Sequence, residues 1–274
     1  ASTITMQLAT DLFFTKEHEG AASVWQSVPL ANGRFGWSPL TGQRTRLSVL
    51  ASEAPDAPSV RLLYALDDLD TGQIAWLDAA APTDEHVLDD IDRGVRWIPG
   101  RRAFVYVAGQ GDDAGELVLY DTETGTGSVL TGDGNEKSYA FGWHAPEENG
   151  ELRALAVVDR RILRIYAPGE DGRLVAIRDI DAGGVIGSPE PFVAGNTSYV
   201  SLIVREGAGR PYSPAHVFVA DMQGGLTPCD DGTDGVVRTD PESYSGINQV
   251  FVYYNVLDRG AWSIRRCATG IPTR

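Results

Sequence analysis

The chain has 274 residues, of which 42% are hydrophobic, and its 23 basic and 38 acidic side chains give a net charge of -15. Such a charge repels nucleic-acid phosphates and anionic membranes, and no apolar run approaches the roughly 20 residues of a membrane-spanning helix. We therefore expect a soluble single domain over residues 1–274 that has neither nucleic acid nor membrane as a partner.

Strand-like runs recur along the whole chain, whereas no long window keeps apolar residues at helical spacing. This pattern predicts an all-β fold. At six places two neighbouring runs flank a turn, and each such pair indicates a β-hairpin. In chain order, the predicted hairpins cover residues 11–28, 60–79, 103–121, 152–167, 199–221 and 249–270.

The spacing of these hairpins predicts a six-bladed β-propeller. Their first strands begin about 42 to 51 residues apart, which is the interval expected when each unit is a four-stranded blade. A short segment ending in proline precedes every hairpin except the first: FGWSP (35–39), VRWIP (95–99), FGWHAP (141–146), VIGSP (185–189) and VVRTDP (236–241). The alternative is a five-bladed propeller, in which the N-terminal hairpin is an elaboration. A β-sandwich competes less well, because it does not explain the regular interval.

Three features favour secretion. Cys229 and Cys267 are the two cysteines, and we expect a disulfide that joins the last two hairpins, with free buried thiols as the alternative. Asn196 begins an Asn-Thr-Ser acceptor pattern for N-glycosylation on a turn next to glycine. The chain begins at Ala1 without a methionine, which is compatible with removal of a presequence.

The hairpins at 60–79 and 249–268 resemble the repeats of fungal fucose-specific lectins, which form six-bladed propellers. That resemblance implies a sugar site in each blade, built from an arginine, a glutamate on the next strand and an aromatic platform. Arg61 and Arg153 stand at matching places, but the partner strands have no glutamate at the required position. We therefore expect the repeated sugar site to be broken. The WSP and WIP segments also resemble repeats of TolB-type propellers, without the Asp-Gly-Lys that usually follows.

A lectin-like propeller without its repeated sites can still use its central tunnel. Secreted fungal proteins similar to these lectins act as hetero-Diels–Alderases, which join a tropolone quinone methide to a humulene-type sesquiterpene alcohol. The resemblance implies the same cofactor-free cycloaddition here, with an apolar small molecule as the partner. The alternative is a carbohydrate-binding lectin with degenerate sites, and a glycoside hydrolase ranks third.

A cycloaddition needs apolar walls that orient the reactants and a hydrogen-bond donor that polarises a carbonyl. Trp37, Trp97 and Trp143 recur at equivalent places before hairpins, so they are the candidate walls, together with Arg61; packing between blades is the alternative role for the tryptophans. The candidate catalytic donors are Arg96, His144, Arg238 and Tyr244, each of which can equally be structural.

The sequence predicts neither a metal nor a cofactor. The four histidines lack metal-ligand spacing, the two cysteines make no zinc pattern, and neither a GxSxG elbow nor a phosphate-binding glycine loop occurs. Carboxylates are concentrated in glycine-rich turns, where we interpret them as solvated charge. Calcium at Asp230, Asp231 and Asp234 is the minor alternative.

Overall fold

The computed structural model describes residues 4–5, 12–18, 21–30, 34–42, 47–51, 59–66, 72–89, 91, 94–207 and 212–273. This part of the chain is all-β, as predicted, apart from the short 3-10 turn η1 (Pro146–Glu148). It contains no helix with the length and apolarity needed to cross a membrane. The chain forms two compact units, Ala1–Ser128 and Val129–Arg274, which are described separately.

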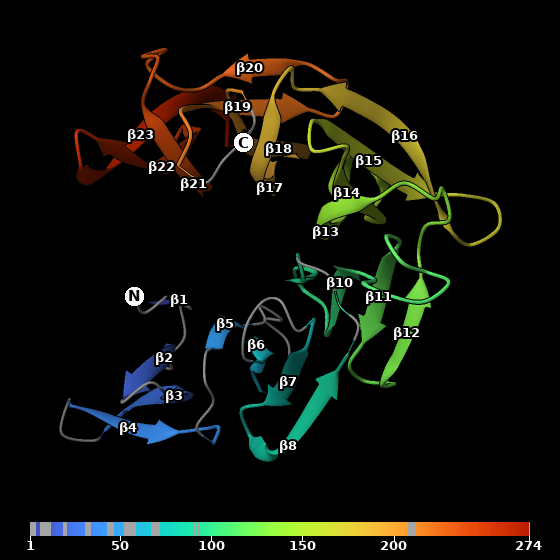
Figure 1. Ribbon diagram of the computed structural model, residues 1–274, viewed down its shortest axis with the longest axis vertical. Coiled ribbons are helices and arrows are strands. Elements are labelled where there is room, and N and C mark those ends of the chain that lie inside the picture. Colours follow the sequence, from blue (N-terminus) through green and yellow to red (C-terminus); the bar gives the residue numbers. More distant parts are fainter. Residues whose placement is uncertain are drawn as a thin grey trace. The chain divides into compact units, whose positions relative to one another are not determined.

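The described residues of the first unit form three antiparallel sheets of four strands each (Figure 1). The first sheet contains β1 (Ile4–Thr5), β2 (Leu12–His18), β3 (Ala21–Pro29) and β4 (Phe35–Pro39). The second sheet contains β5 (Leu47–Ala51), β6 (Arg61–Leu66), β7 (Ile74–Asp78) and β8 (Ala81–Leu88). The third sheet contains β9 (Arg96–Trp97), β10 (Ala103–Val107), β11 (Leu117–Asp121) and β12 (Thr126–Val129).

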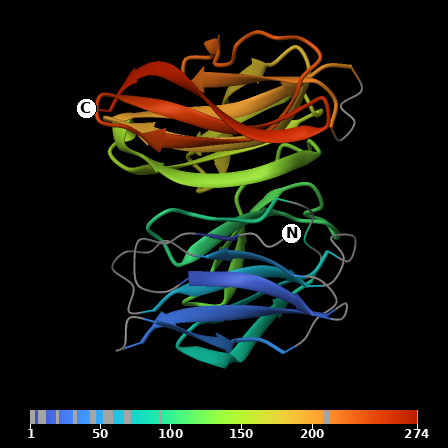
Figure 2. The ribbon, with the colours of Figure 1, turned by 90° about the vertical axis from the view of Figure 1, so that its left-hand side faces the viewer.

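The second unit forms two sheets of four strands and one of three within the described residues. Its first sheet contains β13 (Lys137–Ala145), β14 (Glu151–Val158), β15 (Ile162–Pro168) and β16 (Leu174–Asp181). The next contains β17 (Val185–Ala194), β18 (Thr197–Arg205), β19 (Ala215–Asp221) and β20 (Leu226–Pro228). The last contains β21 (Val237–Ser245) and the long strands β22 (Gln249–Asp258) and β23 (Ala261–Pro272), drawn in orange to red in Figure 2.

All six predicted hairpins are confirmed. In the four-stranded sheets they supply the two middle strands, and in the last sheet β22 pairs with β21 on one side and β23 on the other. Strand order follows chain order within each sheet, so every connection joins antiparallel neighbours. This regular repetition of small sheets differs from the two large sheets of a sandwich.

The hairpin strands are apolar on both faces because both faces of a middle sheet are buried. In β6, Leu62 and Tyr64 pack against the first sheet, whereas Leu63 packs with Phe104 of the third sheet. In the second unit, Leu202 lies in the core shared with the β13–β16 sheet, and Ile203 lies in the core shared with the β21–β23 sheet. Successive side chains of a strand point to opposite faces, so consecutive residues enter different cores.

The first strand of each sheet in the second unit contains a β-bulge. The register shifts between Ser138 and Phe141 in β13, between Gly187 and Glu190 in β17, and between Thr239 and Glu242 in β21. Tyr139, Ser188 and Asp240 occupy the bulges with φ of 57°, 44° and 59°, a region that side chains other than glycine rarely adopt. Bulges redirect side chains and are concentrated near functional sites. The bulges of β17 and β21 are therefore candidates for site positions.

The predicted disulfide is confirmed. Cys229 follows β20 and bonds to Cys267 on β23, closing a loop of 38 residues between neighbouring sheets. Cys229 is buried in the core that also contains Val219 and Val252. The disulfide restricts the unfolded chain and so stabilises the folded state. On the chain-entropy model, a loop of this length contributes about 3 to 4 kcal/mol to the free energy of unfolding.

Replacing both cysteines, as C229S/C267S, should lower the free energy of unfolding by about 3 kcal/mol in urea titrations, because the unfolded chain regains loop entropy. Reduced wild-type protein is the matched control and should unfold at nearly the same urea concentration as the variant. A variant as stable as the oxidised wild type would show that the disulfide does not stabilise this fold.

A cluster of ion pairs around the buried cation Lys137 lies at the start of β13. Lys137, whose side chain is 0% exposed, contacts Asp133 with an Nζ–Oδ1 distance of 2.6 Å. The Arg164 guanidinium and the Tyr166 hydroxyl donate to the other oxygen of Asp133, both at 3.1 Å. Burial by itself raises the pKa of Asp133, but hydrogen bonds from Lys137 and the Asn135 backbone outweigh it and lower the pKa to about 2.

Because the folded pKa of Asp133 is depressed, its contribution to stability is present above about pH 4 and is lost as pH falls through about 2. Asp133→Asn should therefore lower the free energy of unfolding by about 1 to 2 kcal/mol at pH 7, and by less near pH 3, in urea titrations. Asp159→Asn changes an exposed residue and serves as the control. An equal loss of unfolding free energy at both pH values would contradict the stabilising role of the ionised Asp133 carboxylate.

Candidate functional site

An open groove of about 520 Å³ lies in the second unit, and we call it the Trp262 groove. It is lined by Ser188, Tyr212, Thr239, Asp240, Asn255 and Trp262. Its volume falls within the roughly 300–1,000 Å³ typical of small-molecule sites. One wall is aromatic, and the rest offers a carboxylate, an amide and two hydroxyls. Such a lining can pack on a flat apolar face and bond to several polar groups.

The bulges and strand register place these side chains. Ser188 and Asp240 are the two bulge residues of β17 and β21, each followed by a proline that cannot donate to the sheet. Thr239 is paired with Asn255 across β21 and β22, so both side chains lie on one sheet face. The polar half of the groove therefore depends on backbone that the sheets hold in place.

Two exposed aromatic side chains form the other half. Tyr212 precedes β19 and is 65% exposed, whereas Trp262 lies near the start of β23 and is 53% exposed. Their rings meet edge to face, with centroids 6.2 Å apart. Large exposed aromatics are costly in water, so a pair gathered beside polar groups marks a binding surface better than a buried tryptophan does.

The connection between β20 and β21 is anchored by Arg238. This side chain is fully buried, and its Nη2 donates to Asp231 Oδ1 at 2.6 Å and to the Thr233 carbonyl at 3.1 Å. Its Nη1 donates to the Ala215 carbonyl at 2.8 Å, and its Nε lies 3.3 Å from Asp230 Oδ2. Backbone hydrogen bonding from Thr233, followed by the Arg238 guanidinium, lowers the pKa of Asp231 to about 2.

These contacts change the interpretation of two predicted features. Asp230, expected to be solvated turn charge, has a side chain that is only 1% exposed, because Arg238 and the backbone of Val217 hold it in the interior. Asp231 is shared by Arg238 and Arg265. The two aspartates therefore bind arginine instead of forming the calcium set suggested as the minor alternative.

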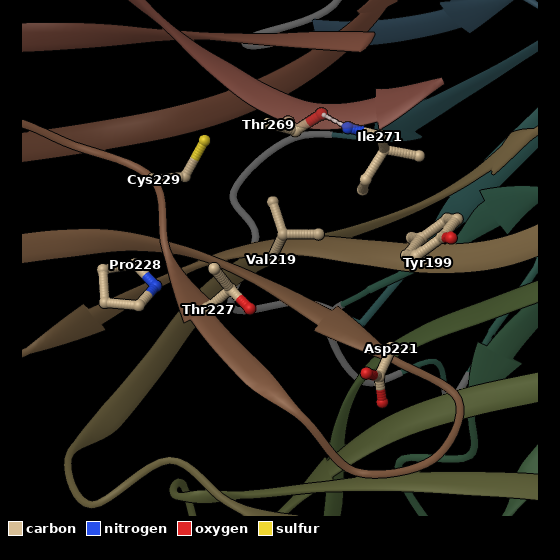
Figure 3. A pocket seen from close by; sticks show the side chains of 8 residues that line it. All are labelled: Tyr199, Val219, Asp221, Thr227, Pro228, Cys229, Thr269 and Ile271. Atoms are coloured by element: carbon tan, nitrogen blue, oxygen red, sulfur yellow. Dashed lines mark hydrogen bonds between the residues drawn. The ribbon is translucent and has the colours of Figure 1, made fainter. Parts of the chain in front are cut away.

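A second cavity lies beside the disulfide, between the β17–β20 sheet and β23 (Figure 3). Its lining residues are Tyr199, Val219, Asp221, Thr227, Pro228, Cys229, Thr269 and Ile271. The volume of about 100 Å³ corresponds to only about three water molecules. We therefore regard the Trp262 groove as the better candidate site.

The four predicted catalytic donors are placed as follows. Arg238 has the anchoring contacts given above. His144 Nδ1 donates to the Gly150 carbonyl at 2.7 Å, and Arg96 on β9 donates to the Val95 carbonyl at 3.0 Å. Tyr244 is 62% exposed, contacts Tyr253 edge to face, and shares its sheet face with the groove residue Thr239. Of these donors in the described chain, Tyr244 is the one on the groove's sheet face, and the catalytic roles stay predictions.

The predicted tryptophan walls do not occupy equivalent places. Trp97 and Trp143 lie on first strands, β9 and β13, but Trp37 lies on β4, the last strand of the first sheet, and is 57% exposed. The prediction of one repeated position is wrong for Trp37, because FGWSP completes a sheet instead of starting one. Trp143 is buried and donates to Ser198 Oγ, and Trp97 packs edge to face on Phe104.

Arg61 and Asn196 differ in their surroundings. Arg61 is buried, donates to Thr122 Oγ1 and lies over the Trp76 ring at 5.3 Å. Desolvation, followed by repulsion from Arg102, lowers the pKa of Arg61, and its contacts are those of a structural side chain. Asn196 is exposed on the turn between β17 and β18, where a glycan would have access.

Sequence reasoning missed the Trp262 groove. None of its six lining residues, Ser188, Tyr212, Thr239, Asp240, Asn255 and Trp262, is among the candidates predicted from the sequence. A signal was present: a Ser-Pro-Glu and an Asp-Pro-Glu triplet, at 188–190 and 240–242, each interrupt the first strand of a sheet. Proline inside a strand pattern indicates a bulge.

No protein-family model matches the chain, and no curated protein matches it. Among solved structures, it is similar to one of two prolyl endopeptidases analysed for inter-domain dynamics, with 13% identity and a TM-score of 0.61, over 99% of this chain and 42% of that one. A post-proline cleaving enzyme from Rickettsia typhi has 10% identity and a TM-score of 0.55, over 98% and 46% of the two chains. An oligogalacturonate lyase in complex with manganese has 13% identity and a TM-score of 0.50, over 89% and 71%.

The chain therefore spans less than half the length of both proline-specific enzymes. At these identities the likeness shows the fold alone, which is all-β and β-propeller-like. Because one fold hosts many unrelated activities, function has to be inferred from the site.

Proposed function

We propose that the protein is a carbohydrate-binding module that holds a neutral saccharide in the Trp262 groove. The observation that supports this most is the exposed pair of Tyr212 and Trp262 beside the polar side chains of Asp240 and Asn255. A sugar ring has an apolar face that packs on an aromatic ring and hydroxyls that bond to carboxylate, amide and hydroxyl groups. The groove offers both kinds of contact on neighbouring strands.

The charge of the site favours a neutral sugar over a uronate. Asp240 brings a carboxylate to the groove, and the chain has a net charge of -15. An acidic sugar would meet repulsion from both, whereas neutral hydroxyls can donate to the carboxylate. This proposed site differs from the repeated sites of the fucose-specific lectins, in which an arginine and a glutamate bind the sugar hydroxyls.

The cycloaddition stays a prediction that ranks second to binding. It needs a hydrogen-bond donor beside an apolar wall, and of its four candidate donors only Tyr244 shares a sheet face with the groove. The groove lining is polar except for its two aromatic rings. These features suit a hydroxylated ligand better than a pair of hydrocarbon-rich reactants.

The finer architecture belongs to the same proposal. We infer that the successive sheets are the six blades of one propeller, which is supported by their regular strand order and by the propeller-like neighbours. We also infer that the protein functions in an oxidising, extracellular compartment. The Cys229–Cys267 disulfide supports that location, because disulfides persist where thiols are not kept reduced.

The binding proposal can be tested by substituting the aromatic platform. The wild-type protein should recognise neutral oligosaccharides on a glycan array, with competition by millimolar monosaccharide. For the best ligand, Trp262→Ala should weaken binding by about tenfold in calorimetry, because stacking on an aromatic ring contributes about 1 kcal/mol or more. Tyr212→Ala should reduce saccharide affinity by less than Trp262→Ala does, because the Tyr212 ring meets the Trp262 ring edge to face.

Trp37→Ala is the matched control, because Trp37 is also an exposed tryptophan but lies on β4 in the other unit. Its saccharide affinity should equal that of the wild type. A wild-type protein that binds no glycan, or a Trp262→Ala variant that binds as tightly as the wild type, would refute the carbohydrate site. Quenching of tryptophan fluorescence by terpenoids but by no sugar would favour the cycloaddition instead.

A further inference from the structure

We propose that Glu206, His216 and Asp234 bind a divalent transition-metal ion of the Zn²⁺ class. Glu206 directly follows β18, His216 lies near the start of β19 and Asp234 lies on the β20–β21 connection, and one ligand atom from each is within 4.8 Å of the other two. His216 pairs with Val204 across the sheet, and Glu206 donates its backbone N–H to Pro214, so both side chains lie on one face. This site is independent of the proposed saccharide groove.

The distances from the His216 ring to the two carboxylates fit ligands of one metal ion better than they fit hydrogen bonds. His216 Nε2 lies 3.6 Å from Glu206 Oε1 and 3.4 Å from Asp234 Oδ1. Hydrogen bonds between nitrogen and oxygen are normally about 2.7 to 3.2 Å long. Two ligands that are each about 2.1 Å from a tetrahedral ion are separated by about 3.4 Å. The two distances from His216 Nε2 to the carboxylate oxygens are therefore close to the separation of two ligands on one ion.

The other ring nitrogen of His216 is held by a buried carboxylate. Nδ1 faces Asp230 Oδ2 at 3.2 Å, and Asp230 also accepts hydrogen bonds from the backbone of Val217 and Gly232, both at 2.8 Å. A carboxylate can only accept, so Nδ1 carries the proton and donates it. In the neutral ring, the Nε2 lone pair then points at two carboxylates. A buried carboxylate behind a metal-binding histidine is the usual outer partner at such sites.

The ligand set determines the class of ion. One imidazole and two carboxylates suit Zn²⁺ and related first-row ions, whereas Ca²⁺ prefers six to eight oxygen ligands. The side chains of Glu206 and Asp234 are 54% and 89% exposed, so an ion has access from solvent and further coordination positions stay open. The net charge of -15 also favours cation binding. A proton would compete with the metal ion for Nε2 of His216.

The test uses tag-free, chelator-treated full-length protein titrated with Zn²⁺ in a calorimeter. We expect one saturable site per chain. His216→Ala, Glu206→Gln and Asp234→Asn should each bind Zn²⁺ at least about tenfold more weakly, and Asp230→Asn, which keeps all three ligands, should weaken binding by about tenfold. His86→Ala is the control, because His86 is a histidine stacked on Trp76 elsewhere in the chain, and its Zn²⁺ affinity should not change.

Circular dichroism should show that each variant is folded. If the His216 or Asp230 variant does not fold, the Glu206 and Asp234 variants still test the site, because those two side chains are exposed and their substitution should not disturb the fold. Absence of saturable Zn²⁺ binding by the wild type would overturn the proposal. So would unchanged Zn²⁺ affinity in both the Glu206→Gln and Asp234→Asn variants, which would show that Zn²⁺ binds elsewhere on the chain. Tighter binding of Ca²⁺ than of Zn²⁺ would overturn the assigned class of ion.

Discussion

The burial of the Arg238 guanidinium is the constraint on which both proposed sites of the second unit depend. An arginine with no exposed surface is costly unless acceptors surround it, and here the Asp230 and Asp231 carboxylates and the Ala215 and Thr233 carbonyls do so. These acceptors lie on the β20–β21 connection and on β19. One buried cation therefore fixes a connection that has no sheet ladder of its own.

Both inferred sites border this connection. Thr239 and Asp240 follow Arg238 directly and line the Trp262 groove, Thr239 opposite Asn255 in the sheet and Asp240 in the β21 bulge. On the other side, Asp230 orients His216 and Asp234 completes the proposed metal cluster. The disulfide at Cys229 fixes the start of the same connection. Buried ions, a bulge and a covalent bond thus hold polar side chains at the surface in defined positions.

The fold was largely predictable from the sequence, whereas the site was not. Runs such as 60–79 and 152–167 are apolar because both sheet faces are buried, so local pattern was enough to find every hairpin. The predicted place of Trp37 is wrong because FGWSP resembles the segments that begin the later sheets. The pairing of β4 with β3 shows that this segment is the last strand of the first sheet. Arg238 is predicted from the sequence as a catalytic hydrogen-bond donor, with a structural role as the alternative, and the structure shows its anchoring contacts. Its role depends on aspartates whose burial arises from tertiary contacts, and single-residue patterns do not encode those.

The role of Arg238 can be measured most directly by amide hydrogen exchange. In the wild type, the amides of Val217, Gly232 and Thr233 should be protected, because they donate to Asp230 or Asp231. In Arg238→Met these amides should exchange at least about tenfold faster, while the amides of the β14–β15 hairpin in the same unit keep their protection. Arg238→Lys, which keeps the charge, should show an intermediate effect. Unchanged protection of these three amides in Arg238→Met would contradict the anchoring role of Arg238.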